Sequence, residues 1–167
     1  MCSSDLTTDP LAQSRLQWYA PQMRRAGFAE AQIQELLTHG GSVVAWGEID
    51  RDTCVPAGLN DVVAIAAGQK LSLAVRSDGT VVAWGSNAWY VPKGLNGVVA
   101  VTTNGLFGVA IRFDGTVVAW GMIDSRGLSA RLSTLSGVLT VALLGDGILP
   151  EAVVALKRDG TVVAWRR

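Results

Sequence analysis

The sequence predicts an all-β protein, an incomplete β-propeller of about three blades built from tandem hairpin repeats and preceded by a short helical hairpin. Two observations support this class. The heptapeptide DGTVVAW occurs unchanged at residues 78–84, 114–120 and 159–165, and a looser copy, GGSVVAW, occupies residues 40–46. The tryptophans that end the copies are at positions 46, 84, 120 and 165, spacings of 38, 36 and 45 residues. Repeats of this length are typical of propeller blades.

The composition indicates a folded domain and excludes several classes of partner. A chain of 167 residues is long enough for one domain with a core, and 49% hydrophobic against 17% charged residues excludes a disordered tail. Fourteen basic residues balance fourteen acidic ones, so there is no basic patch for nucleic acid or for an anionic membrane surface. No apolar run approaches the roughly 18–20 residues of a membrane span. We therefore expect no nucleic-acid partner and no membrane insertion.

Residues 9–40 predict the helical hairpin. Asp9 followed by proline is a typical helix start, and apolar residues then recur at helical spacing. Gly27 ends the first segment and Gly40 ends the second. A DNA-binding helical pair is the alternative, since arginines lie on this segment, but nearby glutamates offset them as on a solvated face. We expect residues 1–8, which begin MCSSDL, to be an artefactual or disordered start.

Residues 41–167 predict the propeller repeats, and the Asp-Gly pair in each copy predicts how a hairpin closes. Both residues tolerate the positive φ of a two-residue turn, so Asp78 and Gly79 predict such a turn inside LSLAVRSDGTVVAW. The cross-strand pairs that follow are Val75 with Val82 and Leu73 with Trp84. Because strand side chains alternate between faces, these bulky residues share one face and the alanines take the other.

Such sheets need neighbours on both sides. Neither face is polar, so we expect the bulky face of one sheet to stack on the slim face of the next, with the tryptophan as the main wedge. An aromatic ring of this size buries about 150–250 Å². The alanine-rich run AIAAG at residues 64–68 suits an inner strand, where sheets converge and space is short.

Several phrases recur together, namely VVAWG at 43–47, VPAGLNDVVAIAAG at 55–68, LSLAV at 71–75 and DGTVVAWG at 78–85. Over about 125 residues, from Gly41 to Trp165, the chain resembles the regulator of chromosome condensation repeat family. Its form is similar to the short bacterial one, of which the propeller-type β-lactamase inhibitor protein is an example. The resemblance implies a seven-bladed propeller of four-stranded blades that bind other proteins through loops on one rim.

The chain departs from the family pattern in three places. Leu71 and Phe107 stand where the family usually has histidine, and Trp89-Tyr90 replaces the usual Gly-Gln pair. Three hairpins and an orphan strand at 43–46 cannot close a seven-bladed ring. We therefore expect either a fragment of a longer protein or several chains that complete one ring. Open sheet edges at both ends predict self-association.

The sequence offers little for catalysis. A single histidine, His39, cannot build a catalytic triad or a histidine-based metal cluster. Asp78, Asp114 and Asp159 each precede glycine in a hairpin turn, which explains them by backbone conformation. Two cysteines are too few for a disulfide framework or a zinc site. We expect no enzyme, no catalytic residue, no metal and no cofactor.

The function predicted from these observations is a non-enzymatic protein–protein interaction module. Trp89 and Tyr90 are adjacent aromatic residues in a short connection between hairpins, as is common for interface anchors. Met122 and Ile123 occupy the matching place one repeat later. We predict that these four residues bind an unidentified protein partner. For the aromatic pair, the alternative is that one ring packs against the neighbouring blade.

Two other functions remain open at this stage. The repeats would serve as a structural spacer in a secreted or cell-surface protein, a location that we favour slightly. A guanine nucleotide exchange factor is the third candidate, because some members of the family act on small GTPases. It ranks last, since that activity depends on a specialised insertion that the sequence lacks.

Overall fold

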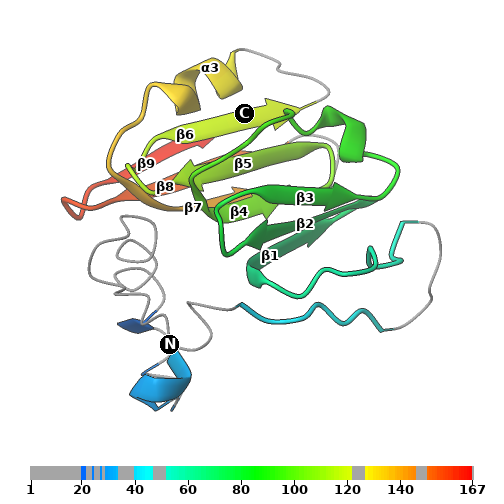
Figure 1. Cartoon of the computed structure of the whole chain (residues 1–167). Coiled ribbons are helices and arrows are strands. Elements are labelled where there is room, and N and C mark those ends of the chain that lie inside the picture. Colours follow the sequence, from blue (N-terminus) through cyan, green and yellow to red (C-terminus); the bar gives the residue numbers. More distant parts are fainter. Residues whose placement is uncertain are drawn as a thin grey trace.

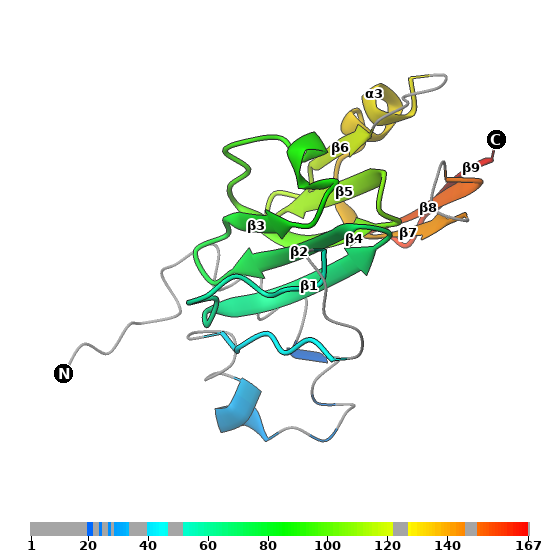
Figure 2. The same ribbon diagram turned by 90° about the vertical axis from the view of Figure 1, so that its right-hand side faces the viewer.

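The repeat region forms three antiparallel sheets that stack one after another along the chain (Figures 1 and 2). The structure is a computed structural model and describes residues 20–21, 24, 27, 29–33, 40–46, 52–121, 127–145 and 150–166. The elements in order are β1 (Val62–Gly68), β2 (Leu71–Arg76), β3 (Val81–Trp84), the 3₁₀ turn η1 (Ala88–Tyr90), β4 (Val98–Thr103), β5 (Phe107–Arg112), β6 (Val117–Gly121), α3 (Leu128–Ser133), β7 (Val138–Leu144), β8 (Ala152–Lys157) and β9 (Val162–Arg166). Each sheet contains three consecutive strands in sequence order, which confirms the incomplete propeller.

The repeated turn is one residue longer than predicted. The Arg76 N–H donates to the Thr80 carbonyl at 2.9 Å, and the Gly79 N–H donates to the Arg76 carbonyl at 2.9 Å. The Asp78 carboxylate accepts hydrogen bonds from the Thr80 amide at 2.8 Å and from the Thr80 hydroxyl at 2.6 Å. Gly79 has a φ of 82°, as the residue after a type I turn in a three-residue hairpin loop requires. The threonine after glycine therefore closes the loop.

This loop makes the predicted strand register wrong. The observed pairs are Val75 with Val81, Leu73 with Ala83 and Ser72 with Trp84, in place of Val75 with Val82 and Leu73 with Trp84. The other two sheets have the same shift, with Trp120 opposite Gly108 and Trp165 opposite Val153. A shift of one residue moves every side chain of the last strand to the other face. The tryptophan therefore lies opposite a serine in the first sheet, a glycine in the second and a valine in the third.

Each sheet has an aliphatic face and a tryptophan face. In the first sheet, the aliphatic face of β2 and β3 contains Leu71, Leu73, Val75, Val81 and Ala83, and the tryptophan face contains Ser72, Ala74, Val82 and Trp84. The indole needs the space that the small residues leave. At Gly108, opposite Trp120, an added Cβ would lie 2.4 Å from the indole Cζ2, so a larger residue there would clash with the ring.

The core lies between unlike faces of neighbouring sheets. Leu71, Leu73 and Val75 are at most 1% exposed and belong to one cluster with Ala110 and Trp120 of the next sheet. The second interface repeats the pattern in a cluster that contains Phe107, Val109, Ile111, Val153, Ala155 and Trp165. The stacking of unlike faces is thus confirmed, although the tryptophan lies on the slim face.

The alanine-rich strand β1 lies where two sheets approach closely. The Gln69 amide, directly after β1, donates to the Asn104 carbonyl, directly after β4, at 3.2 Å. A Cβ on Gly68 would lie 2.3 Å from the Gly105 nitrogen, so only glycine allows this approach. This close approach of two sheets confirms the prediction that AIAAG forms an inner strand, where the sheets converge. The helix α3, which the sequence analysis did not predict, packs against β6 (Figure 1).

The N-terminal part is described only in pieces. Ala20, Pro21, Arg24 and residues 30–33 are helical, and Arg24 forms an ion pair with Glu30 at 2.8 Å. Gly27, Ala29 and Gly40 are described and are not helical, while the rest of the predicted helical hairpin and the start at residues 1–8 lie outside the described residues, so the domain boundaries stay a prediction. None of the helices among the described residues is long and apolar enough to cross a membrane.

Candidate protein-binding surface

The aromatic pair lies on η1, which directly follows the first sheet. The chain turns away from β3 at Gly85, whose φ is 102° and where a Cβ would lie 2.5 Å from the Lys70 carbonyl oxygen. The Asn87 amide donates to that same oxygen at 2.9 Å, and its side-chain amide donates to the Gln69 carbonyl at 3.1 Å. These bonds hold the start of η1 against the β1–β2 turn, so the aromatic residues are carried on a fixed piece of backbone.

The two rings have different surroundings. Trp89 is 73% exposed, whereas Tyr90 is half-buried and packs against the cluster between the first and second sheets. Their centroids are 3.6 Å apart with planes tilted by 32°. Tyr90 therefore packs against the neighbouring blade, which is the alternative given above for one ring of the pair. Its ring also lies against the ring of Trp89. Trp89 alone of the two presents most of its surface to solvent.

Polar residues lie on the loop that carries Trp89 and on the β1–β2 turn to which this loop is hydrogen-bonded. Asp52 accepts hydrogen bonds from the Ser86 amide at 2.7 Å and from the Ser86 hydroxyl. This contact brings the segment before β1 to the loop after β3. Lys70, in the β1–β2 turn, is exposed and has a φ of 56°. An exposed aromatic residue whose loop also carries polar residues has the composition of a small interface centre.

The other two predicted site residues, Met122 and Ile123, lie outside the described residues. The alignment of apolar residues along one rim therefore stays a prediction. The contact between Asp52 and Ser86, which was not expected from the sequence, joins residues that are 34 positions apart. No local pattern signals a contact of that separation.

The turn aspartates have structural partners. The Thr116 hydroxyl and amide donate to the Asp114 carboxylate, and these hydrogen bonds lower the pKa of Asp114 below its ordinary value. The Thr161 hydroxyl and amide likewise lower the pKa of Asp159. A carboxyl with a lowered pKa is a weak base, which suits a turn-forming role. Among the described residues, no three His, Cys, Asp or Glu side chains are grouped as metal ligands.

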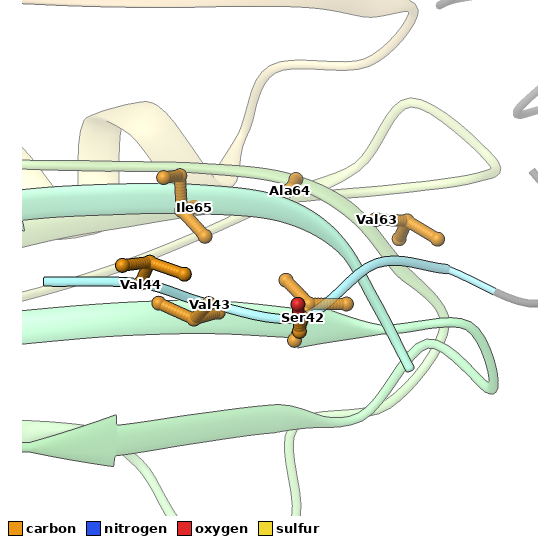
Figure 3. Close-up of a pocket in the computed structure, with 7 residues that line it drawn as sticks. Ser42, Val43, Val44, Val63, Ala64 and Ile65 are labelled. Carbon is orange, nitrogen blue, oxygen red and sulfur yellow. The ribbon is translucent and has the colours of Figure 1, made fainter. Parts of the chain in front are cut away.

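The segment Gly41–Trp46 lies along the first sheet as an extended chain. Gly41 and Val62 exchange backbone hydrogen bonds at 2.7 and 3.0 Å. Beyond this bridge, a pocket of about 240 Å³ separates the segment from β1, and Figure 3 shows Val43 and Val44 beneath Ile65 there. A second hollow, of about 270 Å³, is lined by Trp46 and Trp84 among other residues. This end of the sheet stack is therefore only partly covered.

Comparison with known proteins identifies the repeat. Residues 62–88, from the start of β1 to the start of η1, match the model of the regulator of chromosome condensation (RCC1) repeat. The chain contains an RCC1 repeat. The second and third sheets have the same strand order and the same pairing shift as this RCC1 repeat. The similarity to the short bacterial form in particular stays a prediction.

Among the solved structures to which the chain is similar, human WBSCR16 supports the fold. Human WBSCR16 is 20% identical with a TM-score of 0.52, over 79% of this chain and 40% of that one. Prp20p from Saccharomyces cerevisiae is 22% identical with a TM-score of 0.44, over 64% and 31%. Yeast RCC1 (Prp20) bound to Kap60 is 19% identical with a TM-score of 0.45, over 68% and 31%. The chain thus spans less than half the length of these relatives. No curated protein matches the sequence significantly.

Proposed function

We propose that this RCC1-repeat chain is a non-enzymatic protein-binding module whose contact surface is centred on Trp89. The exposure of Trp89 on a backbone held by hydrogen bonds carries the proposal. A ring that is already fixed loses little conformational freedom when a partner covers it, so more of its burial energy appears as affinity. Tryptophan is also among the residues that most often dominate interface energetics.

The relatives supply a precedent. Yeast RCC1 (Prp20) binds Kap60, and Prp20p has binding properties toward Gsp1p and histones. Those partners belong to those proteins. The proposal for this chain depends on Trp89 and its rim, and it commits to a protein as the class of ligand.

A photocrosslinking experiment identifies the partner. The photoreactive amino acid benzoylphenylalanine replaces Trp89, the chain is irradiated in an extract of its native cells, and the crosslinked proteins are identified by mass spectrometry. The same probe at Trp46, which is 89% exposed, serves as a control for position. A partner of the rim crosslinks at position 89 and not at position 46. A chain that is only a spacer crosslinks to no specific foreign protein at position 89.

Calorimetry with the purified partner then tests the role of the ring. The variant Trp89→Ala removes an anchor worth at least about 2 kcal/mol, so the Kd should weaken by about 30-fold or more. The variant Trp46→Ala, with the same change at another exposed site, should bind as the wild type does. Both should keep the wild-type free energy of unfolding within about 0.5 kcal/mol. An unchanged Kd for Trp89→Ala would refute the proposal.

A further inference from the structure

Large apolar side chains gather at the two ends of the stack of sheets. Eight large hydrophobic residues are exposed among the described residues, and six of them lie at these ends. Val44, Trp46 and Ile65 form one group, called here the tryptophan end, and Leu144, Val154 and Val162 form the other, called the aliphatic end. Figure 2 shows the segment before β1 and the sheet β7–β9 at opposite sides of the stack. The location of the two ends in the stack indicates which surface each of them can bind.

The aliphatic end is the aliphatic face of the third sheet, and the equivalent face is buried in the first and second sheets. Val154 occupies the position in its sheet that Leu73 and Val109 occupy in theirs, and both of those are 0% exposed whereas Val154 is 38% exposed. Val162 corresponds to Val117, and their exposures are 61% and 3%. The register shows why. In the first two sheets this face is covered by the tryptophan face of the following sheet.

The tryptophan end is the other half of the same interface. The Val62 amide donates to the Gly41 carbonyl at 3.0 Å, just as the Val98 amide donates to the Gly79 carbonyl at 3.0 Å. Residues 40–46 therefore stand where the last hairpin strand of a preceding sheet would stand. In that register Trp46 corresponds to Trp120, which is 5% exposed against 89% for Trp46. Trp120 packs on the aliphatic face of the sheet before it.

We propose that a second copy of this chain binds head to tail, with the tryptophan end of one copy on the aliphatic end of the next. Among the described residues this pairing of faces occurs twice, and one unpaired half is exposed at each end of the stack of sheets. The outward residues of β7–β9 in this register are Thr140, Ala142, Leu144, Ala152, Val154, Leu156, Val162, Ala164 and, at the edge, Arg166. A face with one peripheral charge favours an apolar partner surface. Because the two halves differ, the contact is heterologous and produces a ring or an open chain of copies.

The test uses two variants that each block one end. Trp46→Glu places a charge at the tryptophan end, and Val162→Glu places one at the aliphatic end. Both sites are exposed, so the fold should persist, as circular dichroism can verify. Sedimentation velocity of the wild type over a range of concentrations should show growing oligomers. Each variant alone should weaken self-association by about 30-fold or more, the loss expected for a central interface residue.

Mixing the two variants gives the decisive measurement. Each variant retains one intact end, so an equimolar mixture should form a 1:1 dimer that grows no further, with a Kd near that of the wild-type contact. Trp89→Glu, the same charge on the rim, should assemble as the wild type does, which separates this contact from the proposed partner site. A monomeric wild type would overturn the proposal. So would a monomeric mixture, or loss of assembly in Val162→Glu with none in Trp46→Glu, which would indicate two aliphatic ends face to face.

Discussion

The contact between Trp120 and Gly108 allows a prediction in which one substitution changes sign. Trp120 is 5% exposed in the cluster between the first two sheets, so Trp120→Ala should lower the free energy of unfolding by about 3–5 kcal/mol. Gly108→Ala places a Cβ 2.4 Å from Cζ2 and 2.5 Å from Cε2 of that indole. A ring packed between two sheets has little room to move, so this substitution should destabilise by about 1–3 kcal/mol.

The same glycine substitution should have the opposite effect without the ring. The φ of Gly108 is not positive, so the backbone at this position accepts a side chain. In the Trp120→Ala background the Cβ meets a cavity, and replacing a strand glycine by alanine then stabilises by about 0.5–1 kcal/mol. The double-mutant cycle should thus give a coupling energy of about 2 kcal/mol or more.

Urea unfolding followed by far-ultraviolet circular dichroism measures the four free energies, because that signal does not depend on the number of tryptophans. Trimethylamine N-oxide keeps the weaker variants folded if necessary. Trp46→Ala, which removes an indole that is 89% exposed, is the matched control and should leave the free energy within about 0.5 kcal/mol of the wild type at concentrations where the chain is monomeric. A coupling energy near zero would show that the indole does not lie over residue 108 and would refute the stacking described above.

Two further predictions concern the repeated turns. Gly160→Ala at a φ of 82°, with no atom within 4 Å of the new Cβ, should destabilise by about 1–2 kcal/mol, while Gly115→Ala at 81° should cost at least about 1 kcal/mol more, since its Cβ would lie 2.8 Å from the Gly137 Cα; equal losses in urea unfolding would contradict the contact. The lowered pKa of Asp114 means that the unfolded chain binds its proton more readily, so this carboxylate stabilises the fold above its unfolded pKa of about 3.9, and the contribution is lost as the pH falls through the lower folded pKa. Asp114→Asn keeps an acceptor for Thr116 but does not titrate, so its stability should fall less steeply than that of the wild type below about pH 4; parallel acid titrations would contradict the hydrogen-bond assignment.

The proposed contacts at the rim and at the ends depend on separate parts of the molecule. Trp89 lies on η1 beside the β1–β2 turn, whereas the tryptophan and aliphatic ends lie on sheet faces. The variants at Trp89, Trp46 and Val162 therefore test each contact alone. A chain that binds a partner through Trp89 and copies of itself through its ends would display that rim repeatedly along an assembly.

The sequence by itself was sufficient for the class of fold and the location of the hairpins. Identical DGTVVAW copies carry their own local signals, namely glycine for positive φ and apolar side chains that alternate between faces. The same heptapeptide also carries a signal for the longer, three-residue loop. This signal is the threonine after each Asp-Gly pair, which donates a hydrogen bond to the aspartate. A two-residue turn, which the Asp-Gly pair alone predicts, gives a register that is wrong by one residue and therefore exchanges the two faces of the last strand in each sheet.

Only the tertiary structure decided which copies of a repeated residue are buried. Trp46 and Trp120 end nearly the same heptapeptide, yet the first is 89% and the second 5% exposed, because a neighbouring sheet covers only the second. In the same way, Trp89 points outward and its neighbour Tyr90 packs inward. Local sequence specifies backbone conformation over a few residues, whereas burial depends on surfaces brought together from distant positions in the chain. Nearly identical copies of the heptapeptide therefore differ in burial, because different surfaces lie against them.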